Sequence, residues 1–412
     1  MKKEFLLSLF FLLLIRSSMA QKEPDQLVLG TIDSLYSKVL GEERKIWVHV
    51  PNSDPMGIYS RQRYPVVYLL DGNAHFSSVV GMIQQLSEVN GNTICPQMIV
   101  VGIPNTDRTR DLTPTHALTS LLGPDSVFMK NSGGGERFTA FLEKELIPHI
   151  DSLYPTAPYR MLIGHSFGGL TAINILLNHT GLFNSYVAID PSLWWDNQHL
   201  LKETSGILGD KRFDGKSLFL GIANTMKAGF DTLRVQSDTI AANGHIRAIL
   251  KFSSLLREHS NSGLRWSYKY YDKDDHGTVP LITEYDALHF IFSEYRFRYD
   301  DMLNSDFKAD SIINNHYARI SKQMGYTVLP AEQMVNEMAY TYLNNGMSDK
   351  AYSLLAMNVK NYPKSFNVYD SMGDYYLTSG NKAKAIEWFG KALSLKEFPE
   401  TRAKLEQLTN GK

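Results

Sequence analysis

The sequence feature that most constrains the fold is a serine flanked by glycines between a strand-like run and an apolar helix. Residues 160–163 (RMLI) lead into GHSFG at 164–168, and GLTAINILL follows. Glycine at both ends permits a turn too tight for a Cβ, and the turn pushes the serine side chain out above the sheet edge. This context predicts Ser166 as a nucleophile and the backbone N–H of Phe167 as a donor to an oxyanion. The alternative is a glycine-rich turn that serves packing alone.

Short apolar runs alternate with longer amphipathic stretches from about residue 45 to 300. Several runs are apolar throughout, as in strands buried on both faces. The pattern predicts an α/β domain with a mostly parallel sheet and helices on both faces. The expected strands are 45–50, 65–70, 98–103, 160–163, 185–189, 217–222 and 265–271, and the expected helices are 77–88, 136–153, 169–178, 245–259 and 284–297.

After about residue 305 the strand-like runs stop and a repeat of about 34 residues begins. Small residues in the pattern let two antiparallel helices approach closely. The repeat resembles tetratricopeptide repeats over 332–407, preceded by a helical linker at 301–331, and an ordinary helical cap is the alternative. The recurring positions are Ala339, Tyr342, Leu343, Gly346 and Ala351, then Gly373, Tyr376, Leu377, Gly380 and Ala385.

Residues 1–20 have the composition of a signal peptide. Lys2 and Lys3 precede an apolar run at 5–15 (FLLSLFFLLLI), and Ser18 and Ala20 are small residues suited to cleavage before Gln21. The run is too short to span a membrane comfortably. We therefore expect an exported protein, periplasmic or secreted, with no membrane span after cleavage.

The composition excludes several classes of function. The chain has 42 Lys+Arg against 43 Asp+Glu, so it lacks the basic field of a nucleic-acid-binding protein. Its single cysteine, Cys95, excludes an intramolecular disulfide and cysteine-based metal clusters. A hydrophobic content of 43% is ordinary for a chain with a buried core.

A nucleophilic serine needs a base and an acid, which follow it along the chain in this class of fold. His276 comes directly after the strand at 265–271, at the same sheet edge as Ser166, and is the predicted base. The acid is expected after the strand at 217–222, which gives Asp231 as the candidate and Asp238 as its alternative. A Ser–His dyad oriented by Asn224 or a backbone carbonyl stays open. His245 and His289 are interpreted as surface or packing residues, and His165 as packing under the sheet.

The remaining site residues follow from position. The turn after 65–70 is expected to supply a second oxyanion donor from the backbone of Gly72 or Asn73. Trp194 and Trp195 follow the strand at 185–189, and we expect one in the core and one as an aromatic wall for substrate. Arg110 is a candidate substrate-binding residue, with a solvated loop of internal ion pairs as an equal alternative.

Several segments together resemble the esterase-D-like putative esterases. They are YPVVYLLDG (64–72), RTRDLTPT (108–115), GGGERFTAFLEKELIPHIDSLYP (133–155), IGHSFGG (163–169), PSLWW (191–195) and DHGTVP (275–280). The resemblance covers about 27–297 and implies an α/β-hydrolase domain at 27–300, similar to ferric-siderophore and feruloyl esterases. It implies a serine esterase that needs no metal or cofactor, with Ser166 and His276 in catalysis and a binding cleft near 190–195. The chain departs from the family pattern at the acid and in its helical tail.

These observations predict an exported serine esterase acting on a small-molecule or polysaccharide-linked ester. Siderophore, feruloyl and acetyl esters are all open as substrates. Acyl transfer by the same Ser–His site is one alternative. The other is an inert hydrolase-fold scaffold whose repeats bind a protein partner.

Overall fold

The computed structural model describes residues 26–51, 54, 56–120, 123–124, 129–298, 302–304 and 306–410. The predicted signal peptide lies outside these residues. Within them, no helix combines the length and the apolar character needed to cross a bilayer.

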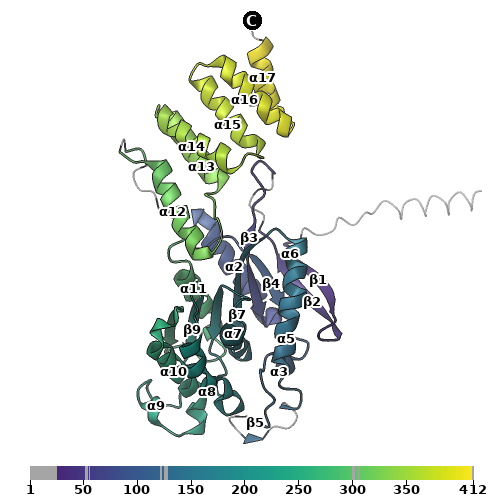
Figure 1. Cartoon of the computed structure of the whole chain (residues 1–412), viewed down its shortest axis with the longest axis vertical. Coiled ribbons are helices and arrows are strands. Elements are labelled where there is room, and N and C mark those ends of the chain that lie inside the picture. Colours follow the sequence, from purple (N-terminus) through teal and green to yellow (C-terminus); the bar gives the residue numbers. More distant parts are fainter. Residues whose placement is uncertain are drawn as a thin grey trace, which may run out of the picture.

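An eight-stranded sheet organises the first two thirds of the chain (Figure 1). Its order is β1-β2-β4-β3-β7-β8-β9-β10; β1, β2 and β4 pair antiparallel in turn, and the other neighbours are parallel. The strands are β1 (Thr31–Ser37), β2 (Glu42–His49), β3 (Tyr64–Leu70), β4 (Ile99–Ile103), β7 (Thr156–His165), β8 (Ser185–Ile189), β9 (Ser217–Ala223) and β10 (Arg265–Tyr271), with a separate small pair, β5 (Thr119–Ser120) and β6 (Gly123–Pro124).

Helices cover both faces of this sheet, which confirms the predicted fold class. Each predicted helix is present, and α8 and the short α3 and α9 are additions. They are α2 (Gly72–Ser87), α3 (Arg108–Asp111), α5 (Gly135–Phe141), α6 (Ile147–Leu153), α7 (Phe167–Asn178), α8 (Trp195–Asp210), α9 (Arg234–Ser237), α10 (Gly244–Glu258) and α11 (Val279–Ile291), with a π-helical turn at Leu142–Leu146 joining α5 to α6.

The strand β3 shows why the central runs are apolar throughout. Val66 and Tyr68 pack with α5, α6, α7, α8 and α10 on one face of the sheet, whereas Val67 and Leu69 pack with α2 and α11 on the other. Both faces of the sheet are therefore shielded from water at β3, and every residue of the strand is buried. The strand β1, which the sequence did not predict, is an edge strand whose Ile32 is 70% exposed, so it carries little apolar signal.

The last third of the chain is helical, as predicted. Gly346 and Gly380, which recur in the repeat, both have positive φ in the turns between helices. Ala339 and Ala351 are fully buried where the first two helices of the repeat region meet. The helices are α12 (Ala309–Met324), α13 (Glu332–Asn344), α14 (Ser348–Asn361), α15 (Phe366–Thr378), α16 (Lys382–Leu395) and α17 (Pro399–Asn410).

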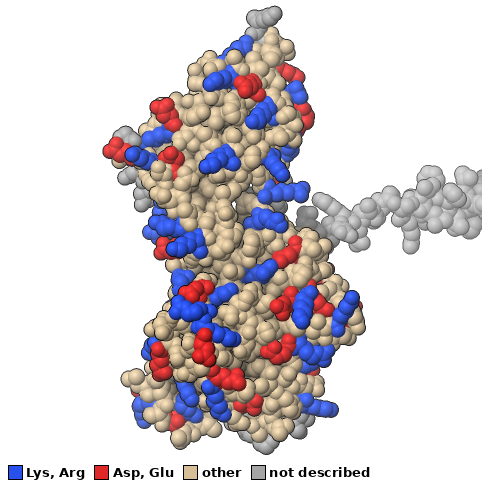
Figure 2. Space-filling view, in the orientation of Figure 1, with Lys and Arg blue, Asp and Glu red and all other residues tan. Residues whose placement is uncertain are grey.

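The helical region is joined to the hydrolase domain by packing and by hydrogen bonds. Ile320 and Met324 of α12 belong to the same apolar cluster as the buried faces of α2 and α11. The loop between β2 and β3 also reaches the repeats (Figure 1), where Lys396 Nζ donates to the Gly57 carbonyl at 2.6 Å. The face shown in Figure 2 carries both signs of charge interspersed.

Glu332 is the central acceptor of this junction and is 2% exposed. Its carboxylate accepts from the Ser60 backbone N–H at 2.9 Å, from Ser365 Oγ at 2.8 Å and from Asn367 Nδ2 at 3.1 Å. One side chain thus satisfies polar groups from the hydrolase domain and from the following helical hairpin.

We expect Glu332→Ala to lower the free energy of unfolding by about 2 kcal/mol or more, because it leaves buried donors without an acceptor. Urea denaturation followed by circular dichroism measures the change. Glu337→Ala is the matched control, since Glu337 is exposed on the same helix. Equal effects of the two substitutions would contradict the role given to Glu332.

Candidate active site

Ser166 occupies a strained turn between β7 and α7. Its φ of 61° and ψ of −111° are rarely adopted by a residue with a side chain. The turn is held by hydrogen bonds from the Ser166 N–H to the Ile189 carbonyl at 2.9 Å and from the Ser192 N–H to the Ser166 carbonyl at 3.0 Å. A Cβ on Gly164 would collide with the backbone of Gly168, so glycine is required there. The backbone strain is consistent with the predicted nucleophile elbow.

His276 lies on the loop between β10 and α11, next to the elbow. Its ring packs against that of His165, the residue before Ser166, with centroids 4.5 Å apart. The loop is fixed by Asn224, whose backbone N–H donates to the Asp274 carbonyl at 2.8 Å. Ser166 Oγ forms a hydrogen bond with Ser192 Oγ at 3.2 Å. It makes no direct hydrogen bond to His276 in this structure.

Asp190 is the carboxylate that orients His276. It follows β8 directly, is fully buried and has a positive φ of 39°. Its Oδ2 accepts from His276 Nδ1 at 2.6 Å and from His245 Nε2 at 2.8 Å, and its Oδ1 accepts from the Ala223 N–H at 3.0 Å. Burial alone raises the pKa of Asp190, but the hydrogen bonds from His245 and His276 outweigh it and hold the pKa well below its ordinary value.

The structure does not place the predicted acids at His276. Asp231 is exposed, and its Oδ1 accepts the N–H groups of Leu233 and Arg234 at the start of the short α9. Asp238, the alternative, bonds to the Ile240 N–H at 2.8 Å and pairs with Arg247. Asp231 is therefore used within the loop that connects β9 to α10, and Asp238 joins that loop to α10.

The position of Asp190 explains the error in the predicted acid. The acid was expected after β9, whereas the carboxylate that reaches His276 follows β8, the strand hydrogen-bonded to β7. In that pair Ile189 lies opposite His165, so Asp190 and Ser166 leave the sheet side by side. The available signal was an aspartate directly after an apolar strand.

His245 is a site residue that the sequence analysis assigned to surface or packing. It lies in the first turn of α10, and its ring meets that of His276 edge-on with centroids 5.2 Å apart. Two imidazole nitrogens and the Asp190 carboxylate thus converge, and together they form a donor set that could hold a metal ion.

Two helix N-termini meet where the oxyanion donors are predicted. Phe167 is the first residue of α7, and Gly72 and Asn73 begin α2. The two ends are close, because a Cβ on Gly168 of α7 would lie 3.4 Å from Oδ2 of Asp71, the residue before α2. N–H groups in the first turn of a helix point out of its N-terminal end, where they can bind negative charge.

Asp71, between β3 and α2, is fixed by ion pairing. Arg108 donates to both of its carboxylate oxygens, at 2.7 and 2.9 Å, and also to the His165 carbonyl at 3.1 Å. The Arg108 guanidinium lies over the Phe167 ring, 5.3 Å from its centroid. This pair connects the start of α2 to the elbow.

The predicted substrate residues divide into two groups. Trp195 is buried, donates its indole N–H to the Thr115 carbonyl at 3.0 Å and packs edge-on against Phe167, whereas Trp194 is only partly buried. This confirms one tryptophan in the core, and Trp194 as an aromatic wall for substrate stays a prediction. Arg110 is paired with Glu42 at 2.7 Å and with Asp111 at 2.7 Å, which corresponds to the alternative of internal ion pairs.

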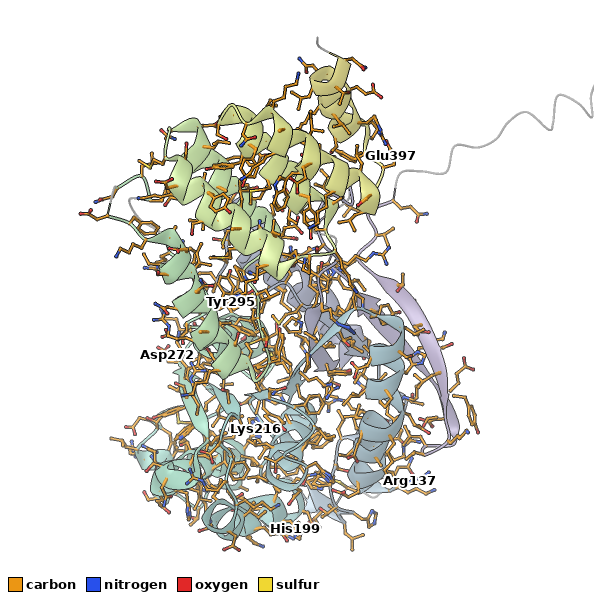
Figure 3. All side chains as sticks on the ribbon, turned by 45° about the horizontal axis from the view of Figure 1, so that its top comes forward. Arg137, His199, Lys216, Asp272, Tyr295 and Glu397 are labelled. Atoms are coloured by element: carbon orange, nitrogen blue, oxygen red, sulfur yellow. The ribbon has the colours of Figure 1, made fainter. Side chains whose placement is uncertain are left out.

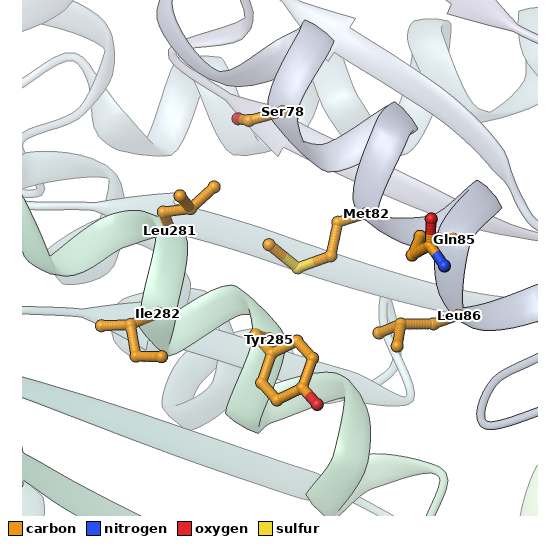
Figure 4. A pocket seen from close by; sticks show the side chains of 7 residues that line it. All are labelled: Ser78, Met82, Gln85, Leu86, Leu281, Ile282 and Tyr285. Carbon is orange, nitrogen blue, oxygen red and sulfur yellow. The ribbon is translucent and has the colours of Figure 1, made fainter.

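A pocket of about 400 Å³ lies between α2 and α11 (Figure 4). Its walls are almost wholly apolar, and Met82 and Leu86 of α2 face Leu281 and Tyr285 of α11 across it. None of the predicted catalytic residues lines this pocket, so we do not place the ester in it.

Comparison with known proteins identifies related esterases. The Putative esterase family matches residues 37–216. A crystal structure of an IroE-like serine hydrolase from Shewanella oneidensis is 31% identical, with a TM-score of 0.68, and the match covers 80% of this chain and 98% of that one.

Two curated relatives are named siderophore esterases. The ferri-bacillibactin esterase BesA of Bacillus subtilis is 33% identical over 34% of this chain and 52% of its own length, so the match spans about half of that relative. The siderophore enterobactin esterase of Emericella nidulans is 29% identical over 52% of this chain and 77% of its own length. These names agree with the predicted enzyme class.

His165 gives the site a pH-dependent stability. Burial first, then the neighbouring imidazoles of His276 and His75, lower the pKa of His165 to about 4. The unfolded chain therefore binds a proton at this residue between about pH 6.5 and pH 4 that the folded chain does not. The contribution of His165 is fully present above pH 6.5 and is lost as the pH falls toward 4.

We expect the free energy of unfolding to fall by up to about 3 kcal/mol over this range on account of His165. Urea titrations at several pH values, on the wild type and on His165→Gln, measure this contribution as the difference between the two slopes. Parallel curves for the two proteins would show that the pH dependence arises elsewhere.

Proposed function

Because this chain belongs to the putative esterase family, we propose that it is an exported serine esterase that cleaves carboxylic esters through an acyl-serine intermediate. The observation that carries the proposal is the hydrogen bond from His276 Nδ1 to the buried Asp190, beside the strained turn at Ser166. An imidazole held in this way presents its other nitrogen as a base.

In the proposed reaction Ser166 Oγ attacks the ester carbonyl while His276 Nε2 accepts the hydroxyl proton. The N–H groups of Phe167 and of Gly72 or Asn73 stabilise the oxyanion. His276 then donates the proton to the departing alcohol, and the carbonyl re-forms as the acyl-enzyme. Water, deprotonated by His276, attacks the acyl group and releases the acid and free Ser166.

The resting hydrogen bond of Ser166 to Ser192 fits this sequence. The proposed reaction requires Ser166 Oγ to exchange Ser192 for His276 as its partner, and we propose rotation about the Ser166 Cα–Cβ bond as that motion. Hydrogen bonds at catalytic residues are often long or misaligned before substrate binds. Ser192 would then help to position the nucleophile between turnovers.

We propose a siderophore ester as the substrate class. The support is the shared family with relatives named for ferri-bacillibactin and enterobactin. Trp194, partly buried beside Phe167, offers an aromatic surface to an aryl group. The intact Asp190–His276 pair argues against an inert scaffold, and hydrolysis rather than acyl transfer follows the names of the relatives.

Export and the role of the repeats complete the proposal. The support for export is the composition of residues 1–20, and we place the mature protein in the periplasm or outside the cell. The tetratricopeptide-like helices at 332–407 stay a predicted surface for a protein partner.

We expect a fluorophosphonate to label Ser166, and Asp190→Asn to slow both labelling and turnover by about three to four orders of magnitude. The asparagine removes the acceptor that fixes the tautomer and orientation of His276. Asp231→Asn is the matched control and should behave as wild type, because Asp231 only caps α9. Mass spectrometry of the labelled peptide gives the site, and a strong effect of Asp231→Asn alone would reverse the assignment.

We expect the wild type to hydrolyse an ester-linked tricatecholate siderophore faster, in kcat/KM, than a feruloyl or acetyl sugar ester. Liquid chromatography of the acid products measures each rate, and Ser166→Ala provides the blank. A clear preference for the sugar esters would redirect the substrate assignment while leaving the serine mechanism in place.

A further inference from the structure

One cluster at the site has more donors than an esterase mechanism uses. His276 Nδ1, His245 Nε2 and Asp190 Oδ2 come from three separate elements, and all lie within 4.8 Å of one another. The established Ser–His–acid arrangement needs only one imidazole on the carboxylate. Two imidazoles with one carboxylate are instead a donor set typical of zinc and other first-row metal sites.

We propose that Asp190, His245 and His276 form an inhibitory binding site for a divalent zinc ion. The inference rests on the proposed role of His276 as the catalytic base. Zinc bound here competes with catalysis, so the site is regulatory and the ester hydrolysis itself needs no metal.

The present geometry lies close to that of a zinc site. The two nitrogens are 2.6 and 2.8 Å from the shared Asp190 oxygen. Ligands bonded at about 2.0–2.1 Å in a tetrahedron lie about 3.3 Å apart, so each nitrogen must move roughly 0.5–0.7 Å farther from the Asp190 oxygen. His276 can move this far because its side chain is 42% exposed on a loop.

The surroundings also suit a bound ion. Asp190 Oδ1 keeps its hydrogen bond from the Ala223 N–H, which fixes the carboxylate while Oδ2 binds the metal. The exposed side of His276 gives access to solvent, and a water molecule can take the fourth position. His245, 12% exposed, is fixed by its place at the start of α10.

Zinc at this position removes the catalytic base by a change of tautomer. In the free enzyme the neutral His276 ring carries its proton on Nδ1 and a lone pair on Nε2. When Nδ1 binds zinc, the single ring proton resides on Nε2, so no proton is gained or lost. Nε2 then has no lone pair to accept the proton of Ser166, and the nucleophile is not activated.

The test uses the full chain and zinc ion alone as the probe. Competition with a chromophoric chelator gives the affinity and stoichiometry, and the initial rate on a p-nitrophenyl ester gives the inhibition. We expect one tightly bound zinc per chain, a loss of turnover and of fluorophosphonate labelling that follows occupancy, and recovery with EDTA. An active enzyme that binds no zinc, or whose turnover does not fall as zinc binds, would overturn the proposal.

His245→Gln separates the metal from catalysis. The glutamine amide can still donate to Asp190 but supplies no imidazole, so we expect zinc affinity to fall about tenfold or more. The inhibition curve, normalised to the zinc-free rate of the same variant, should shift equally. Unchanged affinity in His245→Gln would assign the bound zinc to another place.

His199→Gln is the matched control for zinc on surface histidines. His199 lies at the end of the hydrolase domain remote from the repeats, on α8 (Figure 3), and its ring is 3.5 Å from Glu203 one turn along the helix. We expect its zinc affinity and inhibition to equal those of the wild type. If instead this variant alone loses zinc, the proposal is wrong.

Two further readouts keep the outcomes distinct. Should His245→Gln fail to fold, anomalous scattering from a zinc-soaked crystal of the wild type locates the ion directly, either between His245 and His276 or elsewhere. Absence of turnover and labelling in the zinc-free wild type overturns the proposed esterase function, whereas an active enzyme that zinc does not inhibit overturns only this inference.

Discussion

The hydrogen bonds accepted by Asp190 determine the geometry of the whole site. A carboxylate with no exposed surface is stable only when donors replace the water that it has lost. Asp190 finds them on three elements: the end of β9, the start of α10 and the loop before α11. The carboxylate thereby orients His276 relative to the β7–β8 pair, and Ser166 is the first residue after β7. The hydrogen bonds that stabilise the buried charge of Asp190 are thus the same ones that orient His276.

The sheet and the tight turn at Ser166 were predictable because their signals are local. A strand buried on both faces has an apolar sequence, and β3, β4, β8, β9 and the last part of β7 show this pattern. The glycines around Ser166 indicate a turn too tight for a Cβ, and the structure confirms this at Gly164. The edge strand β1 and the helix α8, which contains Gly206 and Gly209, lack such a signal and were not predicted.

The acid and the second imidazole were not predictable by the same means, because their roles depend on which strands are neighbours. Asp190 directly follows β8 and Asp231 lies farther beyond β9, but the importance of that difference depends on the pairing of β8 with β7. His245 is a single histidine at the start of a helix, and the residues around it in the sequence do not indicate that it contacts Asp190. The two interpretations of Arg110 stayed open for the same reason, since its partner Glu42 is 68 residues away.

The helix α11 links the loop of His276 to α12, the helix that precedes the repeats. It begins three residues after His276, and beyond its end the Tyr295 carbonyl accepts from His316 of α12 at 3.1 Å. Its buried face packs with α12 in the apolar cluster that also holds α2, whose first residues are the predicted oxyanion donors. Removal of α12 would expose this cluster beside the loop of His276 and the start of α2. The helix α12, which precedes the repeats, therefore supports both of these elements of the candidate site.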